Sequence, residues 1–108
     1  MLLFWDSWNR DHIAKHGVSV NEAAYVVAHA RAPYPADAGD DKFCVRGSTP
    51  ASRVLQVIFV YRPVETIALD ELPPHERLEL AEQRAVLYVI HARDLKPGEK
   101  RRLRRRRG

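Results

Sequence analysis

The spacing of apolar residues changes near residue 40, and this change constrains the fold more than any other feature of the sequence. Before that point, apolar side chains recur every three to four residues, which is the spacing of amphipathic helices. After it, three runs rich in Val, Ile, Leu and Phe are typical of β-strands. With 108 residues in all, helices followed by strands favour a single α+β domain over residues 1–108.

A short strand over residues 2–5 and a first helix over about 7–16 are predicted at the start of the chain. Asp6 lies at the junction, where its carboxylate accepts from the free amides of a first helical turn. Gly17 follows the expected helix and adopts the left-handed conformation that ends helices at no steric cost.

A second helix is predicted directly afterwards. Ser19 and Glu22 have the spacing of a capping box, in which each side chain satisfies a free amide of the other residue. This helix should reach about Ala30, and its expected buried face contains Val20, Ala23, Ala24, Val27 and Ala30.

The strands are expected over residues 42–47, 53–61 and 85–93. The first two should form a hairpin, because the residues between them are turn-forming and include a proline. Strict alternation along the third places Leu87, Val89, His91 and Arg93 on one face and Val86, Tyr88, Ile90 and Ala92 on the other.

Two charged segments follow from the same sequence, whose net charge is +4. Residues 63–82 contain six acidic side chains and one basic, and we interpret them as an insertion between strands in which residues 75–83 form a helix. Residues 96–108 contain eight basic side chains and one acidic, a helix opened by Pro97. The basic tail is either a solvated terminus or a surface that attracts RNA or an acidic partner.

Several function classes are excluded at this stage. The longest apolar stretch, residues 54–61, is far below the ~20 residues of a membrane helix, so no membrane association is expected. The first residues lack the basic leader and apolar core of a secretion signal. Cys44 is the only cysteine, which favours the cytoplasm and a role as a small buried apolar residue.

A resemblance rests on the order of several motifs: Trp5, Asp6, Asn9, His12, Ile13, residues 15–19, Glu22, Ala23, Gly47, residues 53–55, 89–93 and 99–102. The Lys-His-Gly-Val-Ser block at 15–19 is the most specific of them. Together they cover residues 2–62 and 84–104 and resemble the BrnT family, RelE-like ribonuclease toxins of type II toxin-antitoxin systems. The chain departs from the family in its insertion at 63–82 and in carrying His91 where many members carry serine.

This resemblance implies a small RelE-like fold, with two N-terminal helices packed on an antiparallel sheet and a basic C-terminal helix. It implies metal-independent RNA cleavage with no cofactor and a BrnA-like antitoxin as partner, and it is compatible with a homo-oligomer. His91 is then the acid or base, because an unperturbed imidazole titrates near neutral pH. The other expected active-site residues are Arg93, Arg53, Lys15 and His16, and RNA contacts are expected from Lys100, Arg101, Arg102, Arg104 and Arg105.

Structural explanations compete with each of these assignments. His91 and Arg93 are also typical of an exposed strand end, and basic side chains such as Lys15 and His16 stabilise a helix C-terminus whatever the function. Loss of cleavage would leave a non-catalytic nucleic-acid-binding or regulatory module. His12 and His16 are four residues apart on a helix, but no third ligand is evident, so no metal site is expected. The two tryptophans, Trp5 and Trp8, are expected to anchor the core.

Overall fold

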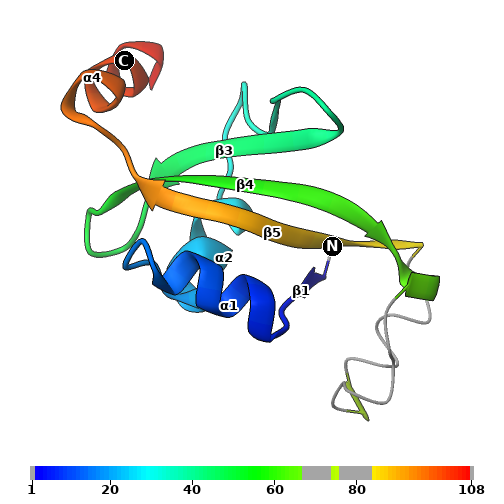
Figure 1. Ribbon diagram of the computed structural model, residues 1–108. Helices are drawn as coiled ribbons and strands as arrows, with labels where there is room; N and C mark the ends of the chain where they lie inside the picture. The colour runs from blue at the N-terminus through cyan, green and yellow to red at the C-terminus, as the bar shows by residue number, and fades with distance from the viewer. Residues whose placement is uncertain (1, 67–73, 76–83, 108) are drawn as a thin grey trace.

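A computed structural model describes residues 2–66, 74–75 and 84–107 of the chain, with side chains up to residue 103 (Figure 1). Most of the acidic segment, including the helix predicted over residues 75–83, lies outside the described residues. The part that is described forms an α+β fold, as the sequence predicts, and its sheet has five strands.

The sheet is mixed, with strand order β1-β5-β4-β3-β2. Its strands are β1 (Leu3–Phe4), β2 (Ala36–Asp37), β3 (Lys42–Ser48), β4 (Val54–Pro63) and β5 (Ala85–Asp94). The prediction of a purely antiparallel sheet is wrong at one edge, because β1 runs parallel to β5. The short β2 was not predicted, since two residues in a proline-rich stretch carry no alternation to detect.

Two helices cover one face of the sheet, α1 (Ser7–Ala14) and α2 (Val20–Ala28), as Figure 1 shows. Asp6 caps α1 as predicted, and Asn9 completes a capping box because its side chain accepts from the Asp6 amide at 2.8 Å. The predicted box of Ser19 and Glu22 caps α2. Both helices end two residues earlier than predicted, and Gly17 adopts a left-handed φ of 72° after α1.

The main core lies between these helices and the sheet. Ala23 is buried and Val20, Val27 and Ala30 pack against the core, as predicted, but the most deeply placed apolar side chain of α2 besides Ala23 is Val26, which the predicted face omitted. From the strands, the core receives Val45, Leu55, Val57, Phe59, Leu87, Val89 and Ala92. Trp5 packs against this core as expected, and Cys44 is half-buried.

A β-bulge in β5 changes which face its side chains occupy. His91 pairs with Ile58 but Val89 pairs with the next residue, Phe59, so Ile90 is an extra residue on β5. After the bulge Ala92, not His91, joins the core of Leu87 and Val89. The predicted alternation is therefore wrong beyond residue 90, although His91 and Arg93 still share one face.

The C-terminal helix α4 (Pro97–Arg107) begins at Pro97 as predicted and is attached by a buried carboxylate. Glu99 accepts from Arg93 at 2.8 and 2.9 Å, from Arg46 at 3.2 Å and from the Lys96 amide at 2.9 Å. The bonds to Arg93 and to the Lys96 amide, with the positive charges of Arg93 and Arg46, lower the pKa of Glu99 to about 2. These contacts hold α4 against β3 and β5, so its basic residues do not form a free tail at this end.

We expect Glu99→Gln to lower the melting temperature at pH 7, because the amide cannot carry the charge that both arginines bind. Ionised Glu99 stabilises the fold above its unfolded pKa near 4.5, and this contribution disappears as the pH falls toward about 2. The difference in melting temperature between wild type and variant should therefore shrink across that range. Thermal unfolding followed by circular dichroism checks this, with the exposed Glu65→Gln as control; a difference that stays constant with pH contradicts it.

Candidate active site

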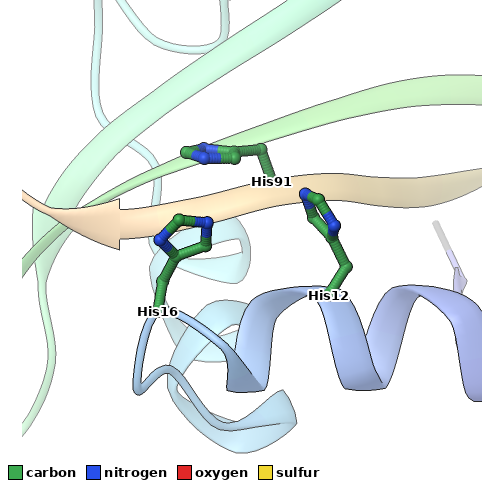
Figure 2. Close-up of side chains that lie close together, drawn as sticks. All are labelled: His12, His16 and His91. Carbon is green, nitrogen blue, oxygen red and sulfur yellow. The ribbon is translucent and has the colours of Figure 1, made fainter.

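Three histidines from distant parts of the chain meet beside β5 (Figure 2). His12 lies on α1, His16 lies in the turn that follows this helix, and both side chains extend toward His91 on β5. The ring of His91 lies 4.7 Å from that of His16 and 5.8 Å from that of His12, measured between centroids. No other described residues of the chain were found to gather imidazole, thiol or carboxylate groups in this way.

The three histidines meet because β1 ends early and α1 packs along the later part of β5. β1 pairs with Leu87 and Tyr88 only, so the later part of β5 has no strand beside it on that side of the described sheet. α1 lies there instead, and its four-residue spacing presents His12 and His16 along the strand. The bulge at Ile90 turns His91 out of the core, where it meets both rings.

Aromatic and polar contacts fix α1 against β5. The indole of Trp8 stacks on the imidazole of His12 at 4.9 Å with an interplanar angle of 5°. Tyr88 donates to the carboxylate of Asp6 at 2.9 Å, and burial together with this bond raises the pKa of Tyr88 to about 12. Trp8 is nevertheless 55% exposed, so the expectation that it anchors the core is wrong.

The electrostatics of the cluster favour a neutral imidazole at its centre. Burial lowers the pKa of His91, and the neighbouring positive charges of His16, His12 and Arg93 lower it further. A neutral imidazole keeps a nitrogen lone pair, which accepts a proton or binds a cation.

The two arginines expected at the site are engaged in ion pairs. Arg93 shares a face with His91, as predicted, but both of its terminal nitrogens donate to Glu99. Arg53 donates to Asp94 at 2.8 Å twice, to Glu22 at 3.1 Å and to the Gly17 carbonyl at 2.6 Å. These bonds raise the pKa of Arg53 and join the start of α2 to the end of β5. Arg53 therefore has a structural role, which is to hold α2 against β5.

The remaining predicted residues lie around the cluster or on α4. Lys15 caps the C-terminus of α1 and is exposed next to His16. On α4, Lys100 is half-buried, Arg101 is exposed, and Arg102 is exposed and lines a cleft of about 230 Å³ with Tyr34, Arg46 and Leu103. The side chains of Arg104 and Arg105 lie outside the described ones.

Sequence reasoning missed His12 and Trp8 as members of the site. The spacing of His12 and His16 was a signal, but the third imidazole is 75 positions further along the chain and no local pattern connects it to them. One ring nitrogen of each of the three histidines lies within 4.8 Å of the corresponding nitrogen of the other two. The expectation that this histidine pair has no third ligand nearby is therefore wrong.

Comparisons of the chain with protein-family models, with curated protein sequences and with solved structures gave no match. Within the residues that the structure describes, no helix combines the length and the apolar character needed to cross a membrane.

Removing the Arg53 side chain should destabilise the fold, because two carboxylates and a carbonyl would lose their donor together. We expect Arg53→Ala to lower the free energy of unfolding by about 1 to 2 kcal/mol. Hydrogen bonds to charged groups stabilise a fold more than fully exposed ion pairs do. Urea unfolding measures this, and Arg10→Ala on the exposed side of α1 should change it by less than about 0.5 kcal/mol. Equal, small effects of the two substitutions would refute the structural role.

Proposed function

We propose that the chain is an endoribonuclease that cleaves RNA without a metal cofactor, and that the histidine cluster is its active site. The observation that carries this proposal is the pair of imidazoles of His91, on β5, and His16, in the turn that follows α1, whose ring centroids lie 4.7 Å apart. Two adjacent imidazoles offer a proton acceptor and a proton donor that both work near neutral pH.

The reaction that suits this pair is transfer of a phosphoryl group within the RNA chain, from the 5′-oxygen of one nucleotide to the 2′-oxygen of the nucleotide before it. The ribose 2′-oxygen attacks the adjacent phosphorus and forms a P–O bond, while the bond from phosphorus to the 5′-oxygen of the next nucleotide breaks. His91, held neutral, accepts the 2′-hydroxyl proton. His16, which is exposed and therefore accessible to the RNA, donates a proton to the 5′-oxygen. The products are a 2′,3′-cyclic phosphate and a 5′-hydroxyl, so atoms and charge balance.

Other groups around the cluster fit an RNA chain. Lys15 is exposed beside His16 and supplies positive charge toward the phosphate. Trp8, exposed and parallel to His12, offers a face on which a base beside the scissile bond stacks. Such stacking contributes about 1–3 kcal/mol per base. The basic α4 adds long-range attraction without sequence preference.

In the cell, we propose that the chain is a toxin of the BrnT type with a RelE-like fold, inhibited by a BrnA-like antitoxin in the cytoplasm. What supports this is the order of its elements: a short first strand and two helices precede the remaining described strands, the last strand carries His91, and a basic helix follows. The lone, half-buried Cys44 agrees with a reducing compartment. Association of the toxin with itself remains part of the same expectation.

One observation favours a second candidate, a non-catalytic RNA-binding module of the same fold. Arg53 and Arg93 are the cations expected to bind the scissile phosphate, and both are engaged with carboxylates. If Lys15 alone does not stabilise the transition state, the chain binds RNA without cleaving it. Growth arrest on induced expression, relieved by the product of a neighbouring gene, favours the toxin, whereas tight binding with no product favours the module.

Replacement of the central imidazole tests the active site. We expect His91→Ala and His16→Ala each to slow cleavage of an RNA oligonucleotide at least about 100-fold, because each removes one proton-transfer group. The double variant should lose little more than the worse single one, since the two groups act in one step.

The control for these variants is His29→Ala, because His29 is exposed and lies outside the cluster. His91→Asn, a smaller polar replacement, separates loss of chemistry from loss of folding. A double variant that is folded and cleaves at the wild-type rate would falsify the assignment.

Removal of metal tests the mechanism in a different way. Because both proton transfers use imidazoles, cleavage should continue in excess EDTA at a rate no lower than that of the untreated protein. Product formation measured after dialysis against the chelator checks this. Loss of activity that one divalent ion alone restores would contradict a metal-independent reaction.

A further inference from the structure

We propose that His12, His16 and His91 form a binding site for one divalent transition-metal ion of the Zn²⁺ class. Each histidine offers one ring nitrogen, and these three nitrogens already lie within 4.8 Å of one another. The site is a property of the folded chain and is measured without RNA.

The geometry is close to that of a bound tetrahedral ion. With Zn–N bonds of about 2.0–2.1 Å, ligating nitrogens stand about 3.3 Å apart. We expect rotation of the side chains to supply the remaining contraction, because α1, the turn after it and β5 already bring the three rings together. His16 is exposed and has room to rotate, and its exposure gives the ion a path from solvent.

The chemistry of the donors selects the kind of ion. Imidazole nitrogens suit Zn²⁺, Ni²⁺, Co²⁺ and Cu²⁺, while Mg²⁺ and Ca²⁺ prefer oxygen ligands. Among the described residues, the cluster contains imidazoles alone and no carboxylate. Three protein ligands leave a fourth position of the tetrahedron for water or another small ligand.

The scaffold distinguishes this cluster from a histidine pair on a free helix surface. Two imidazoles four residues apart on one helix give only two ligands, but the third here comes from a strand that packs against that helix. The parallel stack of Trp8 on His12 holds one ring in its plane. The bond from Tyr88 to Asp6 fixes the start of α1 against β5. Ligands held by neighbouring groups in this way bind metal more tightly than mobile ones.

Occupancy of the site has a consequence that rests on the proposed function. A coordinated imidazole uses its lone pair for the metal, so it no longer accepts a proton from the 2′-hydroxyl. Zn²⁺ bound by the cluster would then inhibit cleavage, and the chelator would restore it.

The test of the site is a titration of the full chain, freed of any histidine tag, with Zn²⁺ in the absence of RNA. Calorimetry should give one ion per chain, and Co²⁺ at the same site should show the visible absorption of a tetrahedral ion that Zn²⁺ displaces. His12→Gln, His16→Gln and His91→Gln should each weaken binding at least about ten-fold. His29→Gln should leave it unchanged, because His29 bonds to Tyr25 outside the cluster.

Each outcome decides the proposal. Absence of binding would overturn it. A stoichiometry other than one, or equal weakening by His29→Gln, would also overturn it and would indicate adventitious surface binding. Should His91→Gln fail to fold, the exposed His16→Gln gives the same decision. Zn²⁺ binding by a chain that never cleaves RNA removes the proposed function and leaves the site, whereas histidine-dependent cleavage without Zn²⁺ binding does the opposite.

Discussion

α1 packs along β5 where the two-residue β1 stops, and the rest of the site depends on this packing. A longer β1 would pair with the later residues of β5 and displace the helix from the strand. The short strand leaves room for α1, while Asp6 both caps the helix and accepts from Tyr88 on β5. One carboxylate thereby sets where α1 begins and how it lies on the strand. That arrangement determines the positions of His12 and His16.

Local patterns predicted most of the elements, because their causes are local. The capping box of Ser19 and Glu22 lies within four residues, and the composition of the apolar runs of β4 and β5 is typical of strands. The bulge at Ile90 has no such signature. It results from how β5 pairs with β4, and a strict alternation assigned His91 to the wrong face.

The candidate site was predicted only in part, because local patterns do not show contacts between distant segments of the chain. His91, His16 and Lys15 were identified as candidates, but the meeting of His91 with His12 is a contact between segments far apart in sequence. Local patterns also did not show that ion pairs engage both arginines. Arg53 and Arg93 carry the charge that a phosphate site needs, yet Asp94, Glu22 and Glu99 already bind them. Whether a cation is free depends on its neighbours in space, which the residue type does not reveal.

The stacking of Trp8 on His12 gives the molecule an optical reporter at its site. The chain has two tryptophans, and the other, Trp5, packs against the core, while Trp8 is exposed to solvent. A positive charge or a paramagnetic ion on the ring beneath an indole alters its excited state, since the two π-systems lie 4.9 Å apart. The fluorescence of Trp8 therefore follows events at the histidines directly, without any label added to the protein.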